Sequence, residues 1–168
     1  IDRVGLSKVV VEGTTGENLK DGPGHFRNTP MPGEVGNAVI AGRRTTYGSP
    51  FRNLDDLRVG DKIEVTTTSG TFVYEVVAPE TDDPEGKASG RAARVVEPGE
   101  EDVLNYAGDN RLTLVTSDPK YFAGARLVVA AELVDDPVPP ADRPRPTVIG
   151  ANESALSGGS SGWAGVLL

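Results

Sequence analysis

Two stretches of the sequence decide the fold and the candidate site: IAGRRTTYG at residues 40–48 and LTLVTSDP at residues 112–119. Each stretch begins with apolar and β-branched residues that favour strands, and each ends in polar residues. A third apolar segment, residues 125–134, carries Arg126 at its start. If the second and third segments pair antiparallel, Ser117 and Arg126 lie opposite each other and share one face of a sheet.

The rest of the chain repeats this pattern of short apolar runs between turns. Twenty-one Gly and thirteen Pro among 168 residues suit many short strands better than a helical bundle. We therefore predict an all-β fold. The expected strands are residues 4–11, 38–41, 62–67, 71–77, 93–96, 112–116 and 125–134, and the expected helical turns are residues 14–19 and 50–57.

Composition argues against several classes of function. The formal net charge is −8 and the isoelectric point is about 4.7, and no segment combines clustered Lys and Arg with aromatic residues. Nucleic acid is therefore not an expected partner. The chain has no cysteine and one histidine, so we expect no disulfide, no metal site and no cofactor.

Proline marks a boundary near the end of the third apolar segment. We expect residues 1–134 to form one domain and residues 135–168 to form a tail, first rich in Pro and then in Gly and Ser. The tail ends in the apolar stretch GWAGVLL, residues 162–168. This end is compatible with the start of a membrane anchor and equally with an ordinary chain end, because a membrane span needs about 20 residues.

Several motifs occur in an order that resembles the class E sortases of actinobacteria. They include the GPGH turn at residues 22–25 and the RTTYG stretch at residues 44–48, which precedes Pro50. The resemblance extends over nearly all of residues 1–134. It implies a sortase-like, closed β-barrel of eight strands with one or two short helices, in which a cysteine, a histidine and an arginine line the catalytic groove.

Two of those three catalytic positions differ in this chain. The resemblance assigns Arg43 to the histidine position and Ser117 to the cysteine position, and only Arg126 matches the family. We treat Arg43, Ser117 and Arg126 as the candidate catalytic positions. Arg43 and Ser117 are degenerate positions, because the family's residue is replaced there. The expected substrate-binding residues are Thr46, Tyr47, Thr116 and Asp118.

The substituted residues do not support the family's chemistry. A serine hydroxyl is a poor nucleophile unless a neighbouring base takes its proton, and the guanidinium of Arg43 stays protonated with no lone pair to offer. His25 and Lys120 are the other candidate bases. We expect His25 to have a structural role, and Lys120 to lie in an exposed turn where its amine stays charged.

Asp118 follows the nucleophile position directly, and we expect its carboxylate to pair with Arg43 or Arg126. A carboxylate there predicts a raised pKa for any thiol introduced at position 117. The two arginines on either side of the Ser117 hydroxyl also suggest a receptor for a carboxylate or another anion.

We therefore predict a cell-surface, sortase-like domain that binds a sorting-signal peptide, a cell-wall protein or an active sortase without catalysing transfer. It would lie at the extracellular face of the membrane, held by a tether outside this sequence. The alternative is a class E transpeptidase that anchors cell-wall proteins and is either trapped by substitution or works through Ser117. A purely structural barrel is a third hypothesis.

Overall fold

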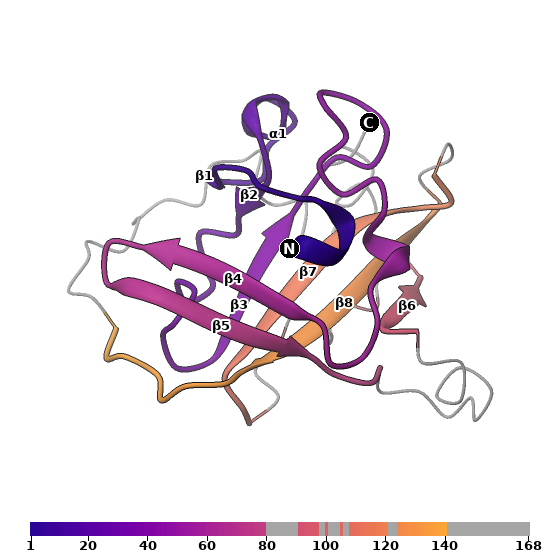
Figure 1. Cartoon of the computed structure of the whole chain (residues 1–168). Coiled ribbons are helices and arrows are strands. Elements are labelled where there is room, and N and C mark those ends of the chain that lie inside the picture. Colours follow the sequence, from indigo (N-terminus) through magenta and orange to yellow (C-terminus); the bar gives the residue numbers. More distant parts are fainter. Residues whose placement is uncertain (80–90, 98–99, 101–104, 106–107, 121–123, 141–168) are drawn as a thin grey trace.

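The structure is a computed structural model that describes residues 1–79, 91–97, 100, 105, 108–120 and 124–140 (Figure 1). The described chain contains eight strands, one short α-helix and two 3-10 turns. In chain order the elements are η1 (Asp2–Val4), β1 (Val11–Glu12), α1 (Asn18–Asp21), β2 (Gly24–His25), β3 (Asn37–Ala41), η2 (Leu54–Asp56), β4 (Lys62–Thr67), β5 (Gly70–Val76), β6 (Ala93–Val96), β7 (Arg111–Asp118) and β8 (Ala125–Leu133).

All eight strands belong to one curled sheet, which confirms the predicted all-β class. The strand order is β1-β2-β3-β7-β8-β5-β4, and β6 pairs with β8 beside this path. β3 and β7 are parallel, whereas β7 and β8 are antiparallel neighbours over their whole length. Figure 1 shows the β4–β5 hairpin crossing in front of β3, β7 and β8, so the curled sheet approximates a barrel.

Residue alternation gives the central strands two buried faces. One face supplies Leu112, Leu114 and Val129 to a large apolar cluster, here called the barrel core, which also contains Phe72 and Tyr74 of β5. The opposite face packs into a smaller cluster, here called the second cluster. It consists of Leu19, Phe26, Val39, Ala41, Val96, Val115 and Val128.

Most predicted strands are confirmed, with small differences at their ends. The hairpin around Ser69 and Gly70 forms as expected, and β7 extends through Asp118, two residues beyond the prediction. The opening strand was predicted wrongly, because η1 occupies residues 2–4 and β1 is only Val11–Glu12. Val9 is 82% exposed, so its β-branched side chain has no packed sheet face to favour a strand.

The predicted helical turns also shift. The helix α1 begins at Asn18, and the backbone N–H of Asn18 donates to the hydroxyl of Thr15 at 3.2 Å. In the second segment only the 3-10 turn η2 forms. Three apolar residues of this segment, Phe51, Leu54 and Leu57, enter the barrel core.

The first residues after β8 remain packed on the domain. The backbone N–H of Val138 donates to the carbonyl of Gly33 at 2.8 Å, and the Val138 side chain contacts the barrel core. The predicted boundary at residue 135 stays a prediction, and the tail from residue 141 lies outside the described residues. Within the described part of the chain, none of the helices has the length and apolar character that crossing a bilayer requires.

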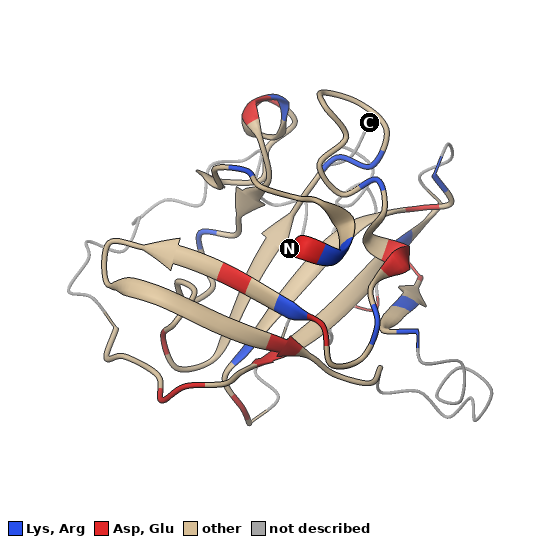
Figure 2. Cartoon of the chain, viewed as in Figure 1, with Lys and Arg blue, Asp and Glu red and all other residues tan. Residues whose placement is uncertain are grey.

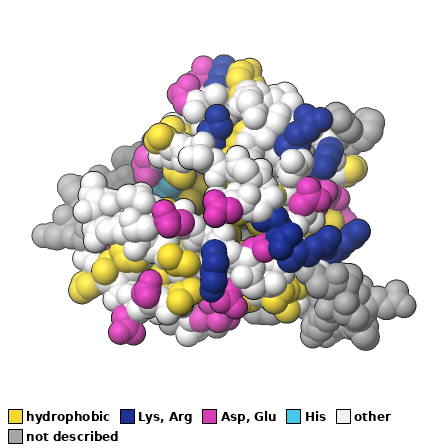
Figure 3. Space-filling view, in the orientation of Figure 1, with side chains coloured by type: hydrophobic (Ala, Val, Ile, Leu, Met, Phe, Trp, Pro, Cys, Tyr) yellow, Lys and Arg dark blue, Asp and Glu magenta, His cyan; other side chains and the backbone are white. Residues whose placement is uncertain are grey.

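Charged side chains of both signs are interleaved over the described chain. Figure 2 shows Lys or Arg next to Asp or Glu on α1 and along the β4–β5 hairpin. The face drawn in Figure 3 likewise mixes basic and acidic side chains without a single-sign surface.

Candidate functional site

The candidate site is built on the ends of three neighbouring strands. Ser117 of β7 is the register partner of Arg126 of β8, as the sequence predicted. The parallel ladder between β3 and β7 pairs Ala41 with Val115, and the N–H of Gly42 donates to the Val115 carbonyl at 3.0 Å. β3 ends at Ala41, two residues before Arg43. Extending its register with β7 by two residues would bring Arg43 level with Ser117, and Arg43, Ser117 and Arg126 are here called the row.

Arg43 is a buried cation whose described contacts lead toward α1. Its side chain is 2% exposed, and Nη2 donates to the carbonyl of Gly16 at 2.9 Å. Its guanidinium carbon lies 5.5 Å from the centre of the Tyr47 ring, within range of a cation–π interaction. Burial lowers the pKa of Arg43 from its usual value, but a guanidinium remains protonated at neutral pH.

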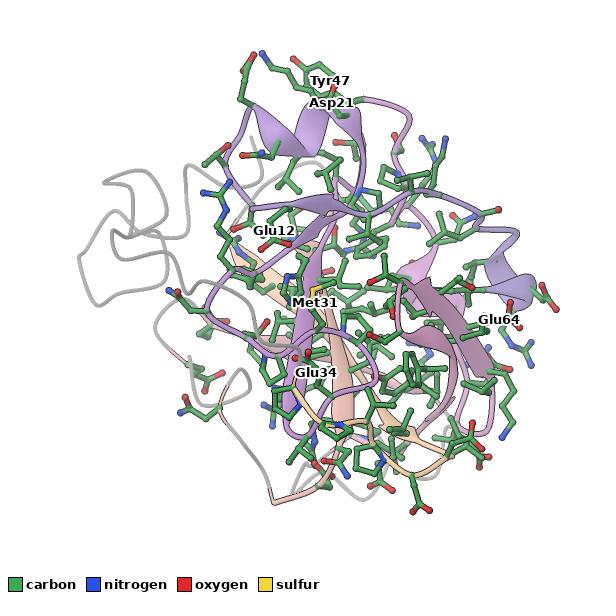
Figure 4. All side chains as sticks on the ribbon, turned by 90° about the vertical axis from the view of Figure 1, so that its left-hand side faces the viewer. Glu12, Asp21, Met31, Glu34, Tyr47 and Glu64 are labelled. Atoms are coloured by element: carbon green, nitrogen blue, oxygen red, sulfur yellow. The ribbon has the colours of Figure 1, made fainter. Side chains whose placement is uncertain are left out.

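Tyr47 lies between two cations at the surface. Its ring centre is also 5.9 Å from the amine of Lys20, and Figure 4 places Tyr47 beside Asp21 at the end of α1. The backbone of Tyr47 has φ of 51°, a conformation uncommon for a large side chain. The ring thus connects α1 to the end of β3 above Arg43.

Arg126 is the second buried cation of the row. Its side chain is 1% exposed, and Nη1 donates to the carbonyl of Ala125 at 2.9 Å. Burial lowers the pKa of Arg126 from its usual value. The described hydrogen bonds of Arg43 and Arg126 go to different carbonyls.

Asp118 pairs with Arg44, and the expected pairing with Arg43 or Arg126 is not found among the described contacts. Arg44 Nη1 donates to Asp118 Oδ1 at 2.6 Å and to the Ser117 carbonyl at 2.7 Å, while Nη2 is 3.1 Å from Asp55 Oδ2. The reason is the alternation of β7, which turns residues 117 and 118 to opposite faces.

The two other candidate bases are held by different partners. His25 is buried, with Nδ1 3.0 Å from Glu12 Oε2 and Nε2 2.9 Å from the carbonyl of Pro30. The Thr29 hydroxyl also lies 3.2 Å from Nε2, so both ring nitrogens have partners other than Ser117. The amine of Lys120 is 3.4 Å from Asp55 Oδ2. Neither residue has a described contact with Ser117.

The remaining predicted binding residues occupy different environments. Thr46 is exposed, next to Tyr47 in the loop after β3. Thr116 is fully buried, and its hydroxyl donates to the carbonyl of Gly42 at 2.8 Å. Thr46 thus lies in the exposed loop that also carries Tyr47, whereas Thr116 faces the opposite side of β7 from Ser117.

Comparison with protein families identifies this architecture. The profile of the sortase domain family matches residues 1–134. The chain belongs to the sortase family. This assignment agrees with the resemblance found in the sequence, and it covers all of the strands described above.

Individual sortases resemble the chain over most of its length. Sortase SrtE1 of Streptomyces coelicolor is 31% identical over 144 residues, which cover 79% of this chain and 36% of that protein. A Clostridium perfringens sortase D5, named as a transpeptidase, has a TM-score of 0.66 at 36% identity, covering 80% of this chain and 76% of that one. For sortase E of Streptomyces avermitilis the TM-score is 0.56, at 34% identity over 80% of this chain and 83% of that one. The chain spans 36–37% of the length of the curated relatives that it matches.

The site of this sortase domain is rich in hydrogen-bond donors and poor in bases. The row contains two guanidiniums and one hydroxyl, and both guanidiniums donate to carbonyls of the chain. Sequence reasoning did not identify Arg44, Asp55 or Gly16 as part of the site. Arg44 has the clearest signal, since it follows Arg43 directly, but nothing in the sequence indicates that Asp55 of η2 reaches the end of β7.

Proposed function

We propose that this sortase-family domain is of the class E type with a degenerate active site, and that it binds a sorting-signal peptide or a partner protein without transferring it. Similarity to two class E sortases supports the type. The partner would be a cell-wall protein or an active sortase at the extracellular face of the membrane, where a tether outside this sequence would hold the domain.

Among the described residues, no hydrogen bond or ion pair brings a base to the Ser117 hydroxyl, and this observation carries the proposal. At the position next to Ser117 in the row stands Arg43, a buried donor bonded to the Gly16 carbonyl. The single histidine of the chain bonds to Glu12 and Pro30, and Lys120 pairs with Asp55. A hydroxyl without a base is a weak nucleophile, and loss of one member of a catalytic unit removes most of its rate enhancement.

The two arginines of the row favour binding. Arg126 keeps the position assigned to the family's arginine, and Arg43 adds a second cation on the same face. Both are desolvated, which strengthens charge-assisted hydrogen bonds to a peptide carbonyl or a terminal carboxylate. The described counter-ion for Asp118 is Arg44, so Asp118 does not fill this face.

Catalysis is tested by incubating the protein with a fluorogenic sorting peptide and a glycine-type amine, followed by mass spectrometry. We expect no cleaved or ligated product above background and no acyl adduct on Ser117. Turnover that Ser117→Ala abolishes would overturn the proposal and support the alternative, a transpeptidase that works through Ser117.

Binding is tested separately with the uncleaved peptide and with peptides ending in a free carboxylate, using calorimetry and NMR shifts. We expect Arg126→Gln to weaken binding at least tenfold, because a charge-assisted hydrogen bond in a desolvated site contributes about 1.5–3 kcal/mol. Arg52→Gln removes an exposed arginine elsewhere and is the matched control. Absence of binding in the wild-type protein would leave the structural barrel as the better hypothesis.

A further inference from the structure

Arg44 is a buried cation at the strand ends that contacts three other groups of the chain. It donates to the backbone carbonyl of Ser117 at 2.7 Å and to the Asp118 carboxylate at 2.6 Å, and it lies 3.1 Å from Asp55. The Arg44 side chain is 3% exposed. A single guanidinium thus joins the segment after β3, the end of β7 and the turn η2.

These contacts surround Ser117, the candidate nucleophile position. The Val115 carbonyl points to β3, where it accepts from the N–H of Gly42, so Arg44 reaches the Ser117 carbonyl at the edge of β7 that β3 no longer covers. The Asp118 side chain, which Arg44 also binds, projects to the face opposite to the Ser117 hydroxyl. Arg44 thus holds the Asp118 carboxylate on that far side. The orientation of the 117–118 peptide and the charge next to it are therefore set by one residue.

We propose that Arg44 is a positioning residue for position 117: it fixes the backbone at the strand end and compensates the charge of Asp118. The inference goes beyond the proposed function, because it holds whether or not the domain binds a peptide. It also changes the expectation for a thiol at this position. The sequence suggested that Asp118 would raise the pKa of such a thiol, whereas a compensated Asp118 has little effect on it.

The chain offers a clean probe of this proposal. It contains no cysteine, so Ser117→Cys introduces the only thiol. The pKa of that thiol follows from the rate of alkylation by iodoacetamide measured between pH 5 and 10. The charged groups around it are Arg126 of β8, Arg43 at the end of β3, and the Arg44, Asp118, Asp55 and Lys120 set on the far side.

The variants are compared in the Ser117→Cys protein. Arg44→Gln leaves Asp118 uncompensated, and we expect the pKa of the thiol to rise by about one unit, a tenfold loss of thiolate near neutral pH. Asp118→Asn leaves part of the Arg44 charge uncompensated, so the pKa should fall. Combining the two changes should return the pKa to within a few tenths of a unit of the starting value. Arg44→Lys keeps the positive charge, so it should raise the pKa of the thiol by less than Arg44→Gln does.

Arg52→Gln is the control for removing an arginine, since Arg52 is exposed, and it should leave the alkylation profile unchanged. An unaltered thiol pKa in a folded Arg44→Gln protein would overturn the proposal. So would a combined variant whose thiol pKa stays as high as in Arg44→Gln alone, because the rise would then not come from the charge of Asp118. If circular dichroism shows that Arg44→Gln does not fold, Asp118→Asn decides: a lowered pKa supports the proposal and an unchanged one rejects it.

Discussion

The two faces of the β7–β8 pair differ in what holds them together. The barrel-core face is apolar along most of β7 and β8, and its contacts are non-directional. The opposite face combines the second cluster with Thr113, Ser117 and Arg126, which are buried polar residues. Because the fold depends mainly on the first face, residues 43 and 117 can change on the second without loss of the sheet.

The largest effect should come from the barrel core. Leu112 is fully buried there, and Leu112→Ala removes apolar contacts and leaves a cavity. We expect the free energy of unfolding to fall by about 2–5 kcal/mol, measured by urea denaturation with an unchanged m-value.

Val95→Ala is the matched control for this substitution. Val95 lies on β6 and is half exposed, so its truncation should change stability by less than about 0.5 kcal/mol. Equal losses in the two variants would contradict the view that the barrel core carries most of the stability.

On the opposite face, stability should depend on specific hydrogen bonds between buried polar side chains. The hydroxyl of Thr113 donates to Asn37 Oδ1 at 2.7 Å in a buried environment, and Thr113→Val keeps the shape but removes this donor. We expect a loss of about 1–2 kcal/mol in the same denaturation experiment. Thr66→Val, which removes an exposed hydroxyl on β4, should cost less, and the reverse order would contradict the comparison.

The difference between the two faces of the β7–β8 pair also explains which features could be predicted from the sequence. Alternation and turn chemistry predicted the β4–β5 hairpin and the register of Ser117 with Arg126, because apolar burial imposes a period of two on each strand. The partner of Asp118 was predicted wrongly. β3 ends at Ala41 and the chain then bends, so alternation no longer tells which of the two following arginines reaches β7. The contact of Asp55 with Arg44 depends on tertiary packing of η2 and has no sequence signal.

A smaller effect is expected at the candidate nucleophile position. Among the described residues no hydrogen bond involves the Ser117 hydroxyl, so Ser117→Ala should change the free energy of unfolding by less than about 1 kcal/mol. The neighbouring Thr116→Val should cost more, because the Thr116 hydroxyl donates to the Gly42 carbonyl. A larger loss for Ser117→Ala would show that Ser117 serves the fold rather than a site.

The smallest effect concerns the pH dependence of stability at the strand ends. Burial raises the pKa of Asp55, but hydrogen bonding to its own backbone and the charges of Arg44 and Lys120 outweigh burial, so the net pKa is lowered from 3.8. A carboxyl with a lower pKa in the folded state stabilises the fold above its unfolded pKa, and this contribution is lost as the pH falls through the folded value.

Asp55→Asn removes the contribution. We therefore expect the free energy of unfolding of the variant to decline less steeply than that of the wild type below about pH 4. The measurement is a series of urea denaturations from pH 6 to pH 2.5 at low salt, where screening is weak. Equal slopes would mean that the Arg44–Asp55 contact, although it links η2 to the end of β7, contributes nothing measurable to the folded state.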